Sequence, residues 1–287
     1  MPIDPEKLLT WPFEDVEHSY SKRDTILYAL GLGFGSDPMD EGELRYVYEE
    51  NLLAVPSMAV VLGYPGFWLK DPETGIDWKQ VLHGEQWLEI LRPIPAEGTV
   101  IGRTKVTDIL DKGADKGAIV YSVRDIIDKA SGEVLARSSM STFCRGDGGF
   151  GGKAGPAPKP HALPETTPDL SCDLATLPQA ALIYRLSGDD NPLHVDPEVA
   201  RAAGFPRPIL HGLATYGIAA RAVLKAYCGY DARRLTSLAV RFSTPVYPGE
   251  TIRVEMWRES AGVAFRAKVA ERDAIVLNNG FAVTDTP

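Results

Sequence analysis

Cysteine is scarce in this sequence, and the three cysteines that occur lie far apart. Cys144, Cys172 and Cys228 form no CxxC pair among the 287 residues. A disulfide framework or a zinc site would need closer or more numerous cysteines. We therefore expect free thiols and a reducing compartment.

Long apolar runs and basic clusters are also missing. No run reaches the roughly 18 apolar residues of a membrane-spanning helix. The 30 basic and 39 acidic side chains give a net charge of −9, which argues against nucleic-acid binding. The first residues, MPIDPEKLLTWPFEDVEHS, do not resemble a secretory or transit signal, and the last, AVTDTP, carry no peroxisomal tripeptide. We therefore expect a cytoplasmic protein with no membrane or nucleic-acid partner.

Glycine and proline are concentrated in one stretch. Residues 146–170 contain six glycines and five prolines, which neither a helix nor a strand sustains. This stretch is interpreted as a linker between an N-terminal unit, residues 1–145, and a C-terminal unit, residues 171–287.

The two units resemble each other. RPIPAEGTV (92–100) parallels TPVYPGETI (244–252), and YALGLG (28–33) parallels YRLSGD (184–189) at a slightly longer offset. An internal duplication explains both pairs. In each unit we expect an early helix, a loop, a more apolar helix and then a run of strands.

Hydrophobic patterns predict the elements of that repeat. LATYGIAARAVLKAY (213–227) is apolar around most of its circumference, which is typical of a buried helix. Residues 252–256 and 265–269 alternate between apolar and charged side chains, as strands with one buried face do. The fold class that follows is α+β, with two antiparallel sheets that each curl around a helix.

Chemically interesting residues gather in YRLSGDDNPLHVDP (184–197). A helix is expected to end at Gly188, and Asp196 is expected to cap the next helix, which begins at Pro197. Between them, a short loop stiffened by proline holds Asp189 and His194. A carboxylate and an imidazole held together suit acid–base catalysis on a bound water, although a purely structural loop has the same pattern.

A second motif, FPRPILHGLATYG (205–217), places His211 and Gly212 at the start of the buried helix. Backbone N–H groups at a helix start are unpaired and lie at the positive end of the helix dipole. Without a side chain at Gly212, its N–H can approach the oxygen of a thioester carbonyl.

Together these motifs resemble the hydratase 2 signature of the MaoC-like (R)-specific enoyl-CoA hydratases, a family that includes the hydratase part of the peroxisomal multifunctional enzyme type 2. VLHGEQWLEILRPIP, ILDKG, RGDGGFGG and RFSTPVYPGET also resemble that family, so the similarity covers nearly the whole chain. The resemblance implies a double hot-dog fold and a homodimer. It also implies the reversible syn hydration of trans-2-enoyl-CoA to (3R)-3-hydroxyacyl-CoA, without metal or redox cofactor.

The family's functional residues are carried over by position. Asp189 and His194 would activate the water, Asn191 would orient the pair, and the Gly212 N–H would polarise the thioester. A second set of residues would line the acyl-CoA site, with Lys112 as a phosphate contact: His83, Gly84, Lys112, His211 and Phe242.

The N-terminal unit lacks the acid–imidazole loop, because its matching stretch, GLGFGSDPMDEG, contains no histidine. One active site per chain is therefore expected, with the N-terminal unit shaped for the acyl tail. The two LHG stretches are 128 residues apart rather than 152, so we expect them to occupy different structural positions.

Several alternatives remain beside the hydratase. A hot-dog thioesterase would attack the same thioester with water, and an acyl-CoA-binding protein would bind without turnover. The glycines of GLGFG and GDGGFGG do not lie between a strand and a helix, as dinucleotide binding requires. A metal site at His194, Asp196 and His211 lacks a helical ligand motif, and Ser187 lies in no GxSxG elbow.

Overall fold

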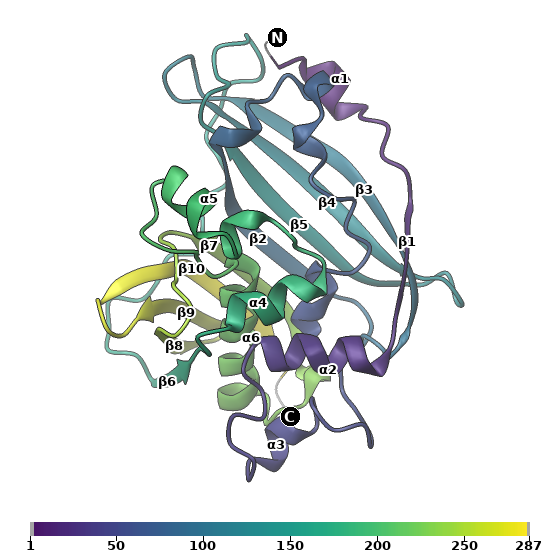
Figure 1. The fold of residues 1–287 in the computed structure, drawn as a ribbon, viewed down its shortest axis with the longest axis vertical. Helices are drawn as coiled ribbons and strands as arrows, with labels where there is room; N and C mark the ends of the chain where they lie inside the picture. The colour runs from purple at the N-terminus through teal and green to yellow at the C-terminus, as the bar shows by residue number, and fades with distance from the viewer. Residues whose placement is uncertain (1–2, 286–287) are drawn as a thin grey trace.

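The fold is built on one antiparallel sheet. The computed structural model describes residues 3–285, and within them the strand order is β1-β3-β4-β5-β2-β7-β10-β9-β8-β6 (Figure 1). The strands are β1 (Val16–Tyr20), β2 (Val81–Ile90), β3 (Gly98–Asp111), β4 (Ala118–Asp128), β5 (Val134–Cys144), β6 (Leu170–Ala175), β7 (Leu235–Phe242), β8 (Thr251–Glu259), β9 (Gly262–Val269) and β10 (Ala274–Thr284).

The sheet has an internal two-fold relation. From the outer edge to the centre, the first half runs β1-β3-β4-β5-β2 and the second β6-β8-β9-β10-β7, which is the same order twice. The central strands β2 and β7 pair antiparallel, with Gln86 opposite Val240. Residues 92–100 and 244–252 both lead from a central strand into the next strand, as the sequence repeat predicts.

Six α-helices and seven short 3-10 helices accompany the strands in the described residues. The α-helices are α1 (Pro5–Leu9), α2 (Lys22–Gly31), α3 (Glu41–Leu44), α4 (Ala180–Tyr184), α5 (Pro197–Ala202) and α6 (Gly212–Tyr227). The 3-10 helices are η1 (Pro56–Val60), η2 (Trp68–Lys70), η3 (Pro72–Thr74), η4 (Trp78–Gln80), η5 (Arg185–Ser187), η6 (Pro192–His194) and η7 (Ala232–Arg234).

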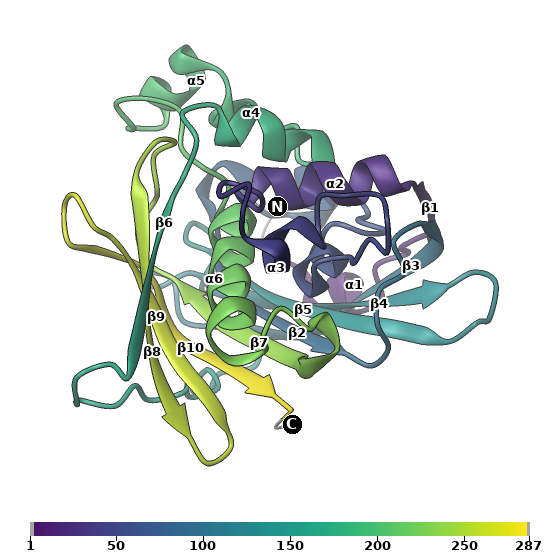
Figure 2. The same cartoon turned by 90° about the horizontal axis from the view of Figure 1, so that it is seen from below.

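Helix α6 is the central helix of the second half. Figure 2 shows it enclosed by the curved sheet, and its residues from Ala214 to Leu224 are all buried. The strands around it present apolar faces, since Ile252, Val254 and Met256 are inaccessible to solvent. The predicted buried helix and the α+β class are therefore confirmed. The two expected sheets, however, are joined edge to edge through the β2–β7 pair into one continuous sheet.

Among the described residues, the first half does not contain the second long apolar helix that the sequence predicts. The five-residue 3-10 helix η1 packs against α6 in that position, followed by the glycine-rich loop Gly63–Phe67. Pro56 begins η1 and prevents its extension toward the N-terminus, and neighbouring valines favour extended backbone. Gly63, with φ +60, lies so close to Gly102 of β3 that a Cβ on Gly63 would be 2.6 Å from the Gly102 Cα. The loop therefore lies directly on the sheet.

Both halves share one core. Helices α2 and α4 lie side by side (Figures 1 and 2), and buried side chains from before and after residue 150 form a single cluster around α6. All three cysteines are free, and in residues 3–285 no helix has the length and apolarity of a membrane span.

Candidate active site

The central strand pair β2–β7 ends beneath the first turn of α6. Residues from both halves meet there, because Phe242 ends β7 and His83 lies near the beginning of the paired strand β2, two positions after its start. Their rings lie 4.5 Å apart, centroid to centroid. The loop between α4 and α5 completes this region with Asp189 and His194.

The loop has a fixed backbone. Helix α4 continues into η5, which ends at Gly188 with φ 111, and Asp196 caps α5 through the amides of Glu198 and Val199, as the sequence predicts. Asn191 is exposed, and its Oδ1 accepts the Leu193 N–H at 3.1 Å. The Asn191 side chain therefore caps the turn that carries His194.

Asp189, His194 and His211 form a tight cluster. One polar side-chain atom from each lies within 4.8 Å of the others. The His194 and His211 rings stack with centroids 3.7 Å apart and an interplanar angle of 28°. The two histidines lie on different elements, since His194 belongs to η6 and His211 is the N-cap of α6.

Hydrogen bonds set the roles of the ring nitrogens. His194 Nδ1 lies 2.8 Å from the Ile209 carbonyl, so it carries the proton and leaves the Nε2 lone pair for a ligand. His211 Nε2 lies 3.2 Å from the Asp189 carbonyl and donates to it. His211 Nδ1 is buried and has no hydrogen-bond partner in the described residues.

Burial keeps the histidines neutral. It lowers the pKa of His194, and the Ile209 carbonyl and the Asp189 carboxylate only partly oppose this. Burial and the neighbouring His194 lower the pKa of His211 to about 3. Desolvation likewise lowers the pKa of His83 to about 4. All three side chains are therefore uncharged near neutral pH.

The start of α6 adjoins this cluster. Gly212 is its first residue and is exposed, so a ligand can reach its N–H, which has no acceptor inside the helix. A Cβ at Gly212 would lie 3.2 Å from the Phe242 ring. Glycine thus leaves space between the helix end and the β7 aromatic side chain.

Lys112 and Gly84 occupy different surroundings. Lys112 follows β3, and its Nζ donates to the Gly155 carbonyl at 3.1 Å. Strand β3 is three positions from β2 in the sheet, a lateral separation of about 14 Å. Gly84 follows His83 at an irregularity of β2, where a Cβ would meet Ser141 Oγ at 2.8 Å. Thus Lys112 does not join the cluster, whereas Gly84 lies beside it.

The two LHG stretches lie in different elements, as predicted. His83 belongs to a strand and His211 to the beginning of a helix. Both histidines nevertheless reach the same region, because His83 contacts Phe242 and Phe242 lies against Gly212.

Two tyrosines near the site were not singled out from the sequence. Tyr184 is buried with its ring 5.0 Å from that of His211, centroid to centroid. Tyr64 lies in the loop after η1 and is 40% exposed, and partial desolvation together with the Asp189 carboxylate raises its pKa. Tyr184 is the first residue of the quoted motif, but no sequence signal links Tyr64 to Asp189.

The cluster of Asp189, His194 and His211 contains atoms that can bind a metal ion, but its geometry suits a bound water better. Lone pairs lie in the imidazole plane, and two face-to-face rings do not aim them at one point. His194 Nδ1 and His211 Nε2 are already hydrogen-bonded to backbone carbonyls. Asp196 is occupied as a helix cap rather than directed at the histidines.

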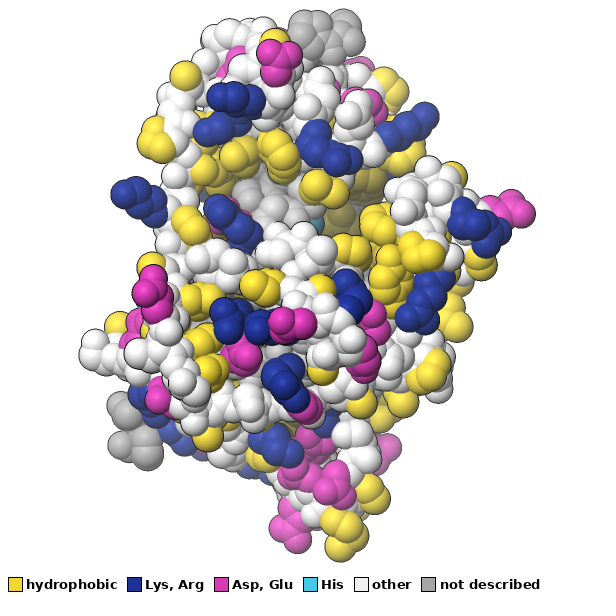
Figure 3. Space-filling view, turned by 90° about the vertical axis from the view of Figure 1, so that its left-hand side faces the viewer, with side chains coloured by type: hydrophobic (Ala, Val, Ile, Leu, Met, Phe, Trp, Pro, Cys, Tyr) yellow, Lys and Arg dark blue, Asp and Glu magenta, His cyan; other side chains and the backbone are white. Residues whose placement is uncertain are grey.

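Figure 3 shows a surface of the molecule with a depression in it. One face is hollowed, hydrophobic and basic side chains surround the depression, and a histidine is visible inside it. An acyl chain needs apolar contacts and the phosphates of CoA need cations, so this combination suits an acyl-CoA ligand.

A hot-dog sheet whose central helix begins beside a carboxylate–imidazole loop defines the class of hot-dog acyl-thioester enzymes. Family models match almost the entire chain: "MFE-2 hydratase 2 N-terminal domain" matches residues 18–146, and "MaoC like domain" matches residues 160–279. The chain belongs to the MaoC-like hydratase 2 family.

Individual relatives agree with that assignment. The chain is 40% identical to the probable enoyl-CoA hydratase 2 of Dictyostelium discoideum, over 99% of this chain and 98% of the relative. It is 38% identical to the peroxisomal multifunctional enzyme type 2 of Mus musculus, over 92% of this chain and 36% of the relative. The crystal structure of a MaoC-like dehydratase from Phytophthora capsici superposes with a TM-score of 0.86 at 38% identity, covering 98% of this chain and 99% of that one.

Proposed function

We propose that this protein is an (R)-specific 2-enoyl-CoA hydratase that reversibly adds water to trans-2-enoyl-CoA and forms (3R)-3-hydroxyacyl-CoA. The observation that carries the proposal is the cluster of Asp189 and His194 beside the free N–H of Gly212. Relatives named as enoyl-CoA hydratases share about 40% of the sequence over nearly the full length.

The proposed reaction uses the site in the following way. The Gly212 N–H, at the positive end of α6, donates to the thioester oxygen and stabilises the negative charge that develops there. A water held between Asp189 and the lone pair of His194 Nε2 gives its hydroxyl to C3 and a proton to C2. The C2–C3 double bond becomes a single bond, and no atom leaves. Because one water supplies both groups, the acid and base roles belong to the pair.

His83 and Phe242 would line the thioester end of the substrate, since both rings adjoin Gly212. Lys112, on the β3–β4 hairpin, would reach the phosphates of CoA, which extend away from the reacting carbons. The first half, where η1 stands in place of a long helix, would hold the acyl tail. These assignments need no redox cofactor, because hydration transfers no electrons, and the Gly212 N–H would polarise the thioester in place of a metal.

The test is the loss of the conjugated enoyl-thioester absorbance on adding the protein to crotonyl-CoA and decenoyl-CoA. A (3R)-specific dehydrogenase should accept the product, and a thiol reagent should detect no free CoA. Release of thiol would identify a thioesterase, and binding without turnover would identify an acyl-CoA-binding protein. The variant Asp189→Asn should reduce the rate by a factor on the order of 10² or more while retaining acyl-CoA binding.

The assembly and compartment are separate proposals. A homodimer is expected, and a mass by light scattering equal to one chain would refute it. A cytoplasmic location is expected, whereas some relatives are named as peroxisomal. Imaging the full-length protein with a fluorescent tag on either end decides between the two compartments.

A further inference from the structure

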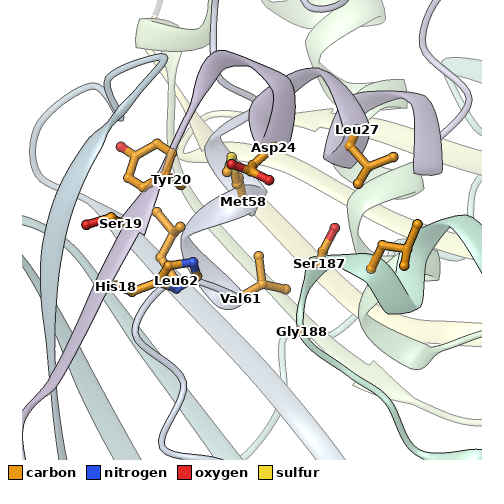
Figure 4. Close-up of a pocket in the computed structure, with 11 residues that line it drawn as sticks. His18, Ser19, Tyr20, Asp24, Leu27, Met58, Val61, Leu62, Ser187 and Gly188 are labelled. Carbon is orange, nitrogen blue, oxygen red and sulfur yellow. The ribbon is translucent and has the colours of Figure 1, made fainter.

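A cavity of about 160 Å³ lies in the first half, immediately beside the candidate active site. It is open to solvent on one side, where Asp24 and Leu186 are exposed, and its walls come from β1, α2, η1 and the end of η5 (Figure 4). Gly188, which forms part of its wall, directly precedes Asp189. An acyl chain whose C3 lies at Asp189 therefore has this cavity within reach.

Its walls are mixed rather than purely apolar. Leu27, Met58 and Leu62 provide hydrocarbon surface, as a fatty acyl chain requires. Asp24 and Ser187 add polar atoms, and in Figure 4 the Ser187 hydroxyl points into the space between the walls. A cavity for a plain alkyl chain has no use for such groups, because burying them under hydrocarbon removes their water without replacing its hydrogen bonds.

Asp24 keeps one free acceptor. Its Oδ2 accepts both the N–H and the hydroxyl of Ser21, at 2.8 and 2.7 Å. Its Oδ1 has no donor within residues 3–285. A ligand in the cavity can therefore donate one hydrogen bond to Asp24.

His18 supplies the complementary donor. Its Nδ1 accepts the Gly63 N–H at 3.1 Å, and burial lowers the pKa of the ring. A neutral ring that accepts at Nδ1 carries its proton on Nε2. His18 therefore offers an N–H in the cavity wall, and the free hydroxyl of Ser187 can either donate or accept.

A hydroxyl group matches this set of partners. It can donate to Asp24 and at the same time accept from His18 or Ser187. A carboxylate would instead face the like charge of Asp24, and a methyl end would offer no hydrogen bond to either Asp24 or Ser187. We propose that the cavity binds a hydroxyl group near the far end of the acyl chain, so that the preferred substrates are hydroxylated enoyl-CoA thioesters. This inference rests on the proposed hydratase function.

The first experiment compares trans-2-enoyl-CoA substrates of six to twelve carbons with and without an ω-hydroxyl. At the chain length that reaches the cavity, the hydroxylated substrate should have a kcat/KM about tenfold or more above that of the plain chain. An ω-carboxyl substrate of that length should show no such gain. Equal kcat/KM for hydroxylated and plain chains at every length would overturn the inference and leave the hydratase proposal intact.

Two variants test whether Ser187 recognises the hydroxyl group of the substrate. Ser187→Ala should reduce the preference for the hydroxylated chain severalfold, mainly by lowering the kcat/KM of the hydroxylated chain. Ser19→Ala is the matched control, because Ser19 also lines the cavity but its hydroxyl pairs with that of Thr99 at 2.8 Å and points away (Figure 4). An unchanged preference in Ser187→Ala, or equal losses in both variants, would argue against the assignment.

A binding measurement separates this inference from the hydratase proposal. Calorimetry with saturated acyl-CoA and its ω-hydroxy analogue requires no turnover. Tighter binding of the hydroxy analogue to the wild type but not to Ser187→Ala is the expected result. If no enoyl-CoA is hydrated, the hydratase proposal fails, and equal affinities for the two analogues would overturn the hydroxyl site independently.

Discussion

The His211 imidazole stacks on that of His194 and also donates to the main-chain carbonyl of Asp189, so one side chain holds both members of the candidate acid–base pair. His211 is also the N-cap of α6, directly before Gly212. Its ring nitrogens are turned to the protein, one bonded and one buried. We therefore assign it a positioning role rather than the ligand contact expected from the sequence.

Replacing His211 by phenylalanine tests this role. The variant keeps an aromatic ring against His194 but loses the donor to Asp189. Because small misplacements of reacting groups are costly, we expect kcat to fall by a factor on the order of 10 to 100, with little change in KM. Steady-state kinetics with decenoyl-CoA measure both parameters.

Tyr216→Phe is the control for His211→Phe. It removes another buried hydrogen bond of α6, from the Tyr216 hydroxyl to the Leu238 carbonyl at 2.9 Å, which lies away from the acid–base pair. Tyr216→Phe should lower stability but not kcat. A rise in KM with unchanged kcat in His211→Phe would instead indicate that His211 contacts the substrate.

The pH dependence follows from the buried His194. Its pKa is lowered from 6.5 by desolvation, so the neutral form, with a free lone pair, persists below pH 6.5. We expect kcat/KM to stay constant down to about pH 6.5 and to decrease only at lower pH, as His194 becomes protonated. A pH–rate profile measures this, and a decrease that begins above pH 7 would contradict the assignment.

Gly212→Ala tests the helix start. The new methyl group would occupy the space beside Phe242 and hinder a thioester oxygen from reaching the N–H. Loss of one such donor reduces kcat by a factor on the order of 10² to 10³. The double variant Gly212→Ala with Phe242→Leu distinguishes two causes of the lost activity, displacement of Phe242 and obstruction of the ligand. Recovery of activity would show that Gly212→Ala acts by pushing against Phe242, and continued loss would show that the methyl group blocks the ligand.

Local patterns predicted the second half more completely than the first. The alternation at residues 252–256 and the apolar surface of residues 213–227 directly reflect burial in the sheet and in α6. The missing helix in the first half was not predicted, because η1 depends on packing. The helix η1 packs against α6, and the loop after it is held at Gly63 against Gly102, a residue about 40 positions away.

The same limit applies to the site. The spacing of Asp189 and His194 and the glycine after His211 can be identified in the sequence, because each belongs to one short segment. The His194–His211 stack and the approach of Tyr64 to Asp189 depend on how three segments meet. No local pattern specifies how the segments meet, so the positioning role that we assign to His211 could be inferred only from the structure.

The Asp111 carboxylate holds the glycine-rich stretch after β5 in place through hydrogen bonds. It accepts the N–H groups of Gly113, Gly149, Gly151 and Gly152, at 2.8 to 3.3 Å. These bonds lower the pKa of Asp111 in the folded protein below its usual value of 3.8. The stabilisation is therefore complete above about pH 3.8 and disappears as pH falls through the lowered pKa.

We expect Asp111→Asn to unfold at lower urea concentration than the wild type at pH 7, with a difference that narrows only below about pH 3.8. Urea unfolding at several pH values measures this. Asp115→Asn, on the same hairpin but exposed, is the control and should have no effect. A difference independent of pH down to the acid transition would show that the ionised carboxylate is not what holds the loop.

Arg221 and Glu43 form a buried ion pair that joins α6 to α3. Their Nη2 and Oε1 atoms are 2.6 Å apart, and the side chains are only 4% and 1% exposed. Arg221 also donates to the Ser36 hydroxyl and the Leu32 carbonyl. Arg221→Met would leave Glu43 buried without its cation, which destabilises a fold by about 3–5 kcal/mol. Urea unfolding measures the loss.

The double variant Arg221→Met with Glu43→Leu shows whether charge or packing is responsible. It removes both charges and replaces them with apolar volume, so most of the lost stability should return. Because the pair lies on α6 nine residues after Gly212, the single variant should affect stability more than kcat at temperatures where it is folded. If the double variant were as unstable as Arg221→Met, the contacts of Arg221 with Ser36 and Leu32, rather than the unpaired carboxylate, would account for the loss.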